Sequence, residues 1–387
     1  MEKFEPGKTF EHIDKLSYEI GPRMAGSKRS GQASKYIKEK FEDYGLETDI
    51  QDFEFSNQLK RTKVIMGILV AVFISSLALN IFLNPIITLG ISLGAVLLTH
   101  YFSSDFASEE EETNIIGRLK NSDEPKKKVV LGAHYDTARC VKGWKWPIFH
   151  KMLLPLVLIA FFFILILPVL GLDFWILSWS ILAIPFVMVS TVPFWGFEDW
   201  VSPGAEDNSS GVSILLEMAR VIDSSDLGDT ELEFVAFGAE EQGLEGSRAY
   251  VEEAEDVDLF LNLDSVGSGD RLCVIEGNGI FRKNETPQDL REKLVEEIEG
   301  GEVWSAFSKH DHLPFLKAGI SATTITSCGE GGKNWLDGVL ESFLGLSNVM
   351  TNRLPQIHTI DDVPEEIELE NLEKSGELLH SVLSFED

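Results

Sequence analysis

The alternation of apolar and polar residues divides much of the chain into short helix-like and strand-like runs. In the segment Ser27–Gly45 the apolar residues Ala33, Ile37 and Phe41 recur at helical spacing, and the run ends on a glycine. This pattern predicts a helix. The following segment, Glu47–Phe55, alternates apolar and polar residues with a period of two, which predicts a strand.

Later runs extend the same alternation of strand and helix. The strand-like runs are Lys127–Asp136, Leu232–Gly238, Leu259–Gly267 and Ala322–Ser327. Segment Ser209–Ile222 is an amphipathic helix that Asn208 or Ser209 could cap at its N-terminus. Strands that alternate with helices predict an α/β fold, with a mostly parallel mixed sheet flanked by helices on both faces.

Four long apolar stretches interrupt this pattern, and none contains Asp, Glu, Lys or Arg. They are Val64–Leu83, Ile86–Phe102, Met152–Leu170 and Phe174–Trp195. A bilayer-spanning helix needs about 20 apolar residues. Hydropathy therefore predicts four transmembrane helices arranged as two inserted hairpins.

Basic residues precede each predicted hairpin, whereas the two apices carry none. The residues concerned are Lys60, Arg61, Lys63, Lys142, Lys145 and Lys151. Since positive charge concentrates on the cytoplasmic side of membrane proteins, we expect an integral protein of the cell membrane whose parts outside the hairpins lie in the cytoplasm.

These assignments divide the chain into one interrupted domain and two insertions. The predicted parts are 1–63 (N-terminal part of the domain), 64–102 (hairpin 1), 103–147 (domain), 148–196 (hairpin 2) and 197–387 (C-terminal part of the domain). The N-terminus lacks the apolar core of a signal peptide.

Composition narrows the possible functions. The chain carries 63 Asp and Glu against 33 Lys and Arg, a formal net charge of −30. This balance argues against nucleic acid as a partner, because that would require a basic face. Cys140, Cys273 and Cys328 are scattered and odd in number, which disfavours a disulfide framework.

Potential metal ligands follow several of the predicted strands. His134 and Asp136 end one strand, Glu240 and Glu241 follow the next, and Asp264 ends a third. Asp207 directly precedes a helix, and His358 lies in an irregular loop. In sheets of this kind ligands gather beyond the carboxyl ends of the strands, and imidazole with carboxylate suits zinc. Taken singly, each of these residues is more often a solvated surface group than a ligand.

Seven segments resemble, in order, the zinc-dependent exopeptidases that include aminopeptidase Y, the dizinc aminopeptidases, glutamate carboxypeptidase and the glutaminyl cyclases. They are Ile20–Ser27 ("IGPRMAGS"), Leu131–Thr137 ("LGAHYDT"), Ser202–Val212 ("SPGAEDNSSGV"), Phe234–Val251 ("FVAFGAEEQGLEGSRAYV"), Leu261–Gly267 ("LNLDSVG"), His310–Ile320 ("HDHLPFLKAGI") and Ile357–Glu368 ("IHTIDDVPEEIE"). Together they touch nearly all of the chain outside the apolar stretches.

The resemblance implies a role for each matching residue. His134 and Asp264 would bind one Zn²⁺, Glu241 and His358 a second, and Asp207 would bridge the two. Glu240 would be the general base. Asp136 would accept a hydrogen bond from the second ring nitrogen of His134. His310 and His312 would be pocket-wall or structural residues, and Asp362 would support the region around His358.

The implied activity is that of a membrane-anchored zinc aminopeptidase acting on peptides, with the lipid bilayer as a second partner. Three alternatives stay open: a dizinc carboxypeptidase, for which Lys333 and Arg353 could bind the substrate carboxylate, a glutaminyl cyclase, and a non-catalytic scaffold. The sequence departs from some relatives where Phe307 stands in place of a tyrosine that stabilises the oxyanion. The oligomeric state is left undetermined.

Overall fold

The structure is a computed structural model of the 387-residue chain. Apart from isolated positions between 157 and 192 and Leu354, it describes residues 3–82, 85–101, 109–122, 124–141, 196–279, 284–298, 300–305, 309–329 and 356–383. Two compact units make up the chain: one comprises Met1–Phe55, Glu111–Arg139 and Trp200–Asp387, and the other Ser56–Glu110 and Cys140–Asp199.

Eleven strands are described. They are β1 (Glu47–Ser56), β2 (Glu109–Lys120), β3 (Lys127–His134), β4 (Arg139–Val141), β5 (Phe197–Val201), β6 (Thr230–Phe237), β7 (Leu259–Leu263), β8 (Arg271–Asn278), β9 (Asn284–Glu285), β10 (Gly301–Ser305) and β11 (Ser321–Cys328). All but β4 and β5 belong to one mixed sheet, whose main path runs β1-β2-β6-β3-β7-β11-β8-β10.

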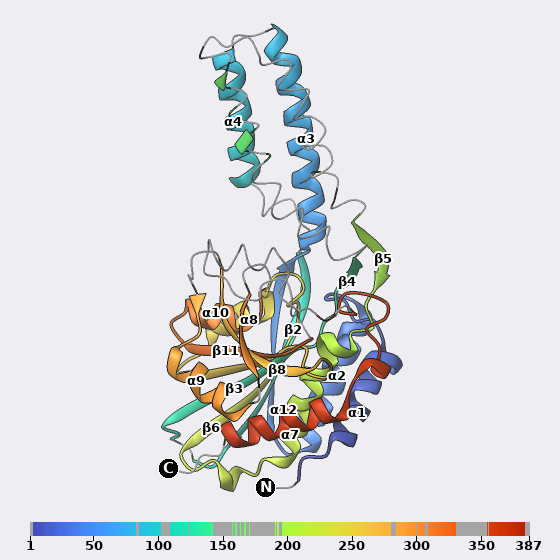
Figure 1. Ribbon diagram of the computed structural model, residues 1–387, viewed down its shortest axis with the longest axis vertical. Helices are drawn as coiled ribbons and strands as arrows, with labels where there is room; N and C mark the ends of the chain where they lie inside the picture. The colour runs from blue at the N-terminus through green and yellow to red at the C-terminus, as the bar shows by residue number, and fades with distance from the viewer. Residues whose placement is uncertain are drawn as a thin grey trace. The chain divides into compact units, whose positions relative to one another are not determined.

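The helical elements separate these strands along the chain (Figure 1). They are α1 (Pro6–Asp14), η1 (Lys15–Ile20), α2 (Lys28–Asp43), α3 (Gln58–Phe82), α4 (Pro85–Tyr101), η2 (Ala205–Ser210), α7 (Gly211–Val221), η3 (Ser224–Asp226), α8 (Glu245–Glu253), α9 (Gln288–Glu297), α10 (His312–Lys317), η4 (Pro364–Glu366) and α12 (Leu369–Val382). The sequence-based α/β assignment with flanking helices is confirmed.

Strand β3 lies at the centre of the sheet and pairs in parallel with β6 on one side and β7 on the other. The next strand beyond β7, β11, is parallel to it as well. Antiparallel pairs occur further out, between β2 and β6 and between β11 and β8. Because β3, β6 and β7 point the same way, their carboxyl ends meet at one edge of the sheet.

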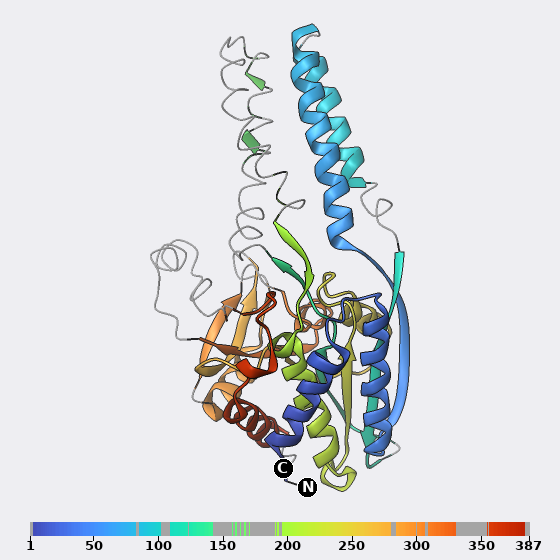
Figure 2. The ribbon, with the colours of Figure 1, turned by 90° about the vertical axis from the view of Figure 1, so that its right-hand side faces the viewer.

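Alternate residues of each central strand enter two different apolar clusters. Leu131 of β3 belongs to the cluster that α1, α2, α7 and α12 cover, and these helices are visible together in Figure 2. The preceding residue, Val130, belongs to the opposite cluster, where Phe237 and Phe260 pack against Phe315 of α10. A strand buried on both faces therefore reads as a continuous apolar run, as in parallel sheets generally.

Of the two predicted hairpins, the structure describes the first, which lies in the second unit, but little of the second. Helices α3 and α4 correspond to the first predicted hairpin, and the hydroxyl groups of Ser76 and Ser92 form a hydrogen bond between them. The second predicted hairpin, Met152–Trp195, lies almost wholly outside the described residues.

The prediction of transmembrane helices is wrong for the part of the chain that the structure describes, where no helix is both long and apolar enough to cross a membrane. Helix α4 has 17 residues, so at about 1.5 Å per residue it falls short of the ~30 Å hydrocarbon core. Helix α3 is longer and has Lys60, Arg61 and Lys63 in its first turns. The expected integral membrane localisation, which rested on these spans, is overturned by the same finding.

Candidate metal centre

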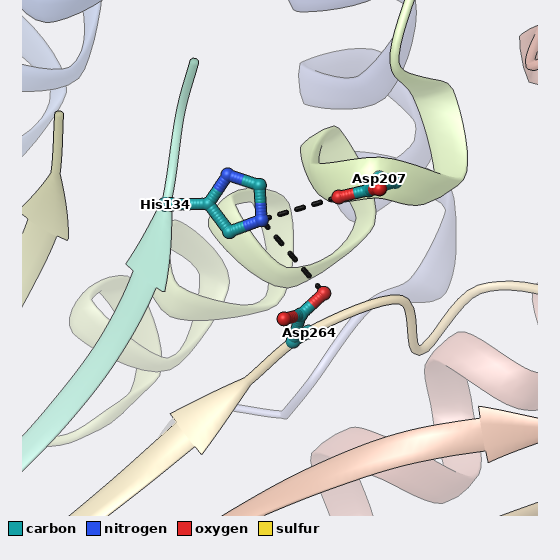
Figure 3. Close-up of side chains that lie close together, drawn as sticks. All are labelled: His134, Asp207 and Asp264. Carbon is teal, nitrogen blue, oxygen red and sulfur yellow. Dashed lines mark ion pairs between the residues drawn. The ribbon is translucent and has the colours of Figure 1, made fainter. Parts of the chain in front are cut away.

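His134 is the last residue of the central strand β3, and its side chain is 1 % exposed. Its Nε2 atom lies 3.1 Å from Oδ1 of Asp207 and 3.8 Å from Oδ1 of Asp264. Figure 3 shows the two carboxylates converging on this one ring nitrogen from different elements. The neighbouring strand β7 ends immediately before Asp264, so two adjacent parallel strands deliver two of the three groups.

Asp207 comes from η2, the turn that leads into α7, and it faces two imidazoles at once. While its Oδ1 faces His134, its Oδ2 lies 3.0 Å from Nε2 of His358. The same His358 nitrogen lies 3.0 Å from Oε1 of Glu241. Two three-residue groups with metal-binding geometry result, His134–Asp207–Asp264 and Asp207–Glu241–His358, and Asp207 belongs to both.

Glu240 and Glu241 are held in place through their backbone. Oδ1 of Asp136 accepts a hydrogen bond from the N–H of Glu240 at 3.0 Å, and Oδ2 accepts one from Glu241 at 3.2 Å. Nδ1 of His134 lies 3.2 Å from the carbonyl oxygen of Asp136 and 3.5 Å from its Oδ1. The main-chain oxygen of Asp136 is thus closer to His134 than its carboxylate is, and the carboxylate fixes the segment that carries the glutamate pair.

The electrostatics of this cluster call for positive charge at its centre. Burial lowers the pKa of His358, but Glu241 and Asp207 more than compensate and raise it to about 10. Burial would raise the pKa of Asp207, yet hydrogen bonds with His134 and His358 hold it below its ordinary value. A protonated imidazole at His358 would supply the counter-charge that a bound cation would otherwise provide.

Glu240 has a different environment from its neighbour. Burial raises its pKa well above the ordinary value, His134 opposes this shift, and the charges of Glu241 and Asp311 add to it. Neither of the two metal-binding groups includes Glu240. A half-buried carboxylate beside a candidate cation site but outside its candidate ligands has the character of a general base or acid.

Left-handed backbone conformations accompany three of the segments that carry these residues. Ala239 has a φ of 55°, Ser265 of 59° and His358 of 61°. Non-glycine residues in this region cost on the order of 1–3 kcal/mol and concentrate at functional sites. His358 is itself a candidate ligand, and Ala239 and Ser265 directly adjoin Glu240 and Asp264. At each of these positions the chain turns sharply beside a site residue.

The structure also assigns positions to residues whose function the sequence left vague. Nδ1 of His310 lies 2.6 Å from Oδ2 of Asp264, so this histidine supports a candidate ligand. His312 is fully buried and its Nδ1 lies 2.7 Å from the hydroxyl oxygen of Thr324. Phe307, Lys333 and Arg353 lie outside the described residues.

Sequence reasoning missed the contribution of Asp362 to the turn around Asp207. Its carboxylate accepts the backbone N–H groups of Glu206 and Asp207 at 2.6 and 3.3 Å. We expected this residue to support His358, four positions earlier in the chain. Nothing in the sequence near Asp362 indicates its contact with Asp207, which lies 155 residues earlier in the chain.

The donor atoms fit a small dication of the zinc type. Two imidazoles and three carboxylates supply nitrogen and oxygen only, and their closest separations within the two groups are 3.0 and 3.1 Å. Donors that surround one zinc ion tetrahedrally at 2.0–2.1 Å lie about 3.3 Å apart. The two groups therefore have the spacing, donor types and charge that zinc requires.

Comparisons with known proteins agree with this chemistry. Residues 188–383, about half of the chain, match the family model described as Peptidase family M28. The chain is 33% identical over 192 residues to Aminopeptidase YwaD of Bacillus subtilis (strain 168), a match that covers 46% of this chain and 36% of that protein. It thus spans little more than a third of the relative's length.

Solved structures share the fold. A zinc aminopeptidase from Bacillus subtilis, BSAP, superposes with a TM-score of 0.58 at 18% identity, covering 98% of this chain and 95% of that one. A glutaminyl cyclase of Bacteroides thetaiotaomicron bound to N-acetylhistamine gives a TM-score of 0.61 at 16% identity, covering 100% and 99%. With the sequence match to the family model over half of its length, this chain belongs to Peptidase family M28.

Proposed function

We propose that the protein is a zinc-dependent aminopeptidase that binds two Zn²⁺ ions and removes N-terminal residues from peptides. One observation carries the proposal: two groups of potential ligands share Asp207, and Glu240 stands beside them outside both groups. His134 and Asp264 would hold one ion, Glu241 and His358 the other, and Asp207 both. A zinc pair supplies acidity to a water molecule and polarises the scissile carbonyl.

The chain's own residues would then carry out the proton transfers. Glu240 would take a proton from the attacking water as its oxygen adds to the carbonyl carbon. As the C–N bond breaks, Glu240 would return that proton to the leaving amine. Asp136 contributes by accepting the backbone N–H groups of Glu240 and Glu241, which holds the main chain that carries the base and the ligand.

The adjacent positions of Glu240 and Glu241 suit this division of labour. A glutamate that must gain and lose a proton in each turnover cannot serve at the same time as a tight metal ligand. Glu241 lies 3.0 Å from Nε2 of His358 and belongs to a ligand group. Burial without such a partner leaves Glu240 able to change its protonation state.

Metal analysis combined with three peptide substrates tests the proposal. We expect two zinc ions per chain and cleavage of a C-terminally blocked peptide with a free N-terminus, abolished by a chelator and restored by zinc. Cleavage of only the N-terminally blocked peptide would identify a carboxypeptidase. Conversion of an N-terminal glutamine to pyroglutamate without peptide cleavage would identify a glutaminyl cyclase. Metal binding without any turnover would indicate a non-catalytic member.

A further inference from the structure

Arg23 is a fully buried cation whose side chain binds main-chain oxygens rather than a carboxylate. It lies in the loop between η1 and α2. Its guanidinium donates to the carbonyl oxygens of Tyr135 at 2.6 Å, Pro203 at 2.7 Å, Gly204 at 2.9 Å and Leu16 at 3.4 Å, and to the hydroxyl of Ser209 at 2.7 Å. Burying a charge is costly unless its donors are satisfied, and here the whole fork is engaged.

Apart from Leu16, which lies in η1, these acceptors belong to two segments that carry candidate metal ligands. Tyr135 directly follows His134, and its carbonyl oxygen receives the Nε–H of Arg23. Gly204 and Ser209 flank Asp207, and both receive hydrogen bonds from Nη2. The backbone N–H of Arg23 also donates to Oγ1 of Thr137 at 3.0 Å. One guanidinium therefore joins the end of β3 to the turn that presents Asp207.

The two segments are also in close packing contact at this point. Gly204 has a φ of +64°, and a Cβ atom there would lie 2.3 Å from Cγ2 of Thr137 and 3.3 Å from Nη2 of Arg23. Only a glycine fits this conformation and this spacing. The distance between the two segments is thus set by direct contact on one side and by the Arg23 fork on the other.

The charge of Arg23 is matched to its surroundings. Burial lowers its pKa to about 10, while Asp362, Asp136 and Asp207 act in the opposite direction. The group therefore stays protonated at neutral pH, close to an acidic cluster but without a direct ion pair to it. The Arg23 side chain thus holds the segments around Tyr135 and Gly204 together, and its charge offsets part of the negative charge of Asp362, Asp136 and Asp207.

We infer that Arg23 is a positioning residue that sets the separation of His134 and Asp207 for metal binding. This inference rests on the proposed function, because it concerns the same ligand groups. Its physical basis is geometric: the planar fork reaches both segments at once, which a lysine ammonium on a flexible stem cannot reproduce. Residues that orient metal ligands from behind typically contribute ~10–100-fold to metal affinity.

Cobalt binding tests the inference independently of turnover. Co²⁺ would be titrated into the chelator-treated full chain, with the visible absorption spectrum and the dissociation constant as readouts. We expect Arg23→Gln to weaken Co²⁺ binding ~10–100-fold and to alter the spectrum, with Arg23→Lys intermediate. Glu233→Gln is the matched control, since it removes a buried carboxylate that binds Lys128, Arg118 and Tyr250 in another part of the unit. It should lower thermal stability but leave Co²⁺ affinity unchanged.

The outcomes separate this inference from the proposed function. Wild-type protein that binds no Co²⁺ would overturn the proposed function itself. Wild-type protein that binds Co²⁺, together with an Arg23→Gln variant of equal affinity and identical spectrum, would overturn only the role of Arg23. If Arg23→Gln does not fold, Ser209→Ala decides, because it removes one acceptor of the fork and leaves the guanidinium in place. Unchanged affinity in folded Arg23→Lys and Ser209→Ala would then overturn the inference.

Discussion

Asp136 accepts the backbone N–H of Glu240 at 3.0 Å, so the position of the proposed base depends on a carboxylate two residues after His134. Asp136→Asn would keep the shape of the side chain but replace one carboxylate oxygen with an NH₂ group. That group cannot accept the hydrogen bond from Glu240 or Glu241 that the oxygen accepts. We expect kcat to fall ~10–100-fold, in the range typical of groups that orient metal-site residues. Asp52→Asn, at an exposed position of β1, should leave kcat unchanged.

The adjacent glutamates should respond differently to the same substitution. Glu240→Gln removes the proposed base, and we expect kcat to fall ~10²–10⁴-fold with zinc content retained. Glu241→Gln removes a ligand donor, so zinc content should fall together with activity. Zinc per chain, measured by elemental analysis alongside initial rates, distinguishes them. Equal zinc loss in both variants would contradict the separation of roles.

The shared position of Asp207 predicts a difference in metal content between two aspartate variants. Asp264→Asn removes a donor from one group, whereas Asp207→Asn weakens both. After dialysis at limiting free zinc, we therefore expect about one ion per chain for the first variant and fewer for the second, since each group needs its full ligand set. Identical zinc content in the two variants would show that Asp207 does not bridge.

Gly132 gives a test of the packing beneath the site. A Cβ atom at this position of β3 would lie 2.5 Å from the Phe237 ring and 2.6 Å from the Phe260 ring. Gly132→Ala should destabilise the protein by about 1–3 kcal/mol, the range for overpacked cores. Gly301→Ala, where a Cβ atom would lie 4.0 Å from Cζ of Arg271, is the control. Urea unfolding would give both values, and equal values would contradict the argument.

Because of His12, the free energy of unfolding should decrease as the pH is lowered. Burial lowers its pKa to about 4, against 6.5 in the unfolded chain. Above pH 6.5 both states are neutral at this residue. Between pH 6.5 and 4 only the unfolded chain gains the proton, so stability decreases as the pH falls, by up to about 3 kcal/mol at ~1.4 kcal/mol per pKa unit.

Comparing two histidine variants isolates that contribution. His12→Gln should flatten the dependence of the unfolding free energy on pH over this interval, relative to the wild type. His380→Gln changes an exposed histidine of α12 and should leave the slope as it is. A slope that is unaffected by loss of His12 would show that this imidazole is not held neutral.

Local sequence patterns were sufficient for the central strands and for the residues at their ends. The run before His134 is apolar on both faces, and β3 ends where the first charged or polar group appears. The same holds for β7, which ends immediately before Asp264. Strand β2 was not predicted, because it begins with four consecutive glutamates and lacks regular alternation.

Contacts between distant segments account for what the sequence did not predict. Arg23 stands in a segment that resembles the exopeptidases, but nothing local indicates that its guanidinium reaches Tyr135 and Gly204. The transmembrane prediction failed for a related reason. Hydropathy records only the composition of a stretch, and among the described residues no helix combines the length and the apolarity that a bilayer requires.

The double contact of Asp207 has a consequence for how the protein would be loaded. A carboxylate whose two oxygens face His134 and His358 separately would be drawn into place by whichever cation arrives first. The second cation would then meet a pre-ordered oxygen, while also meeting the repulsion of its predecessor across a single bridge. Occupancy of the two halves would therefore be interdependent, and the half-loaded enzyme would be a distinct species with its own affinity and its own rate.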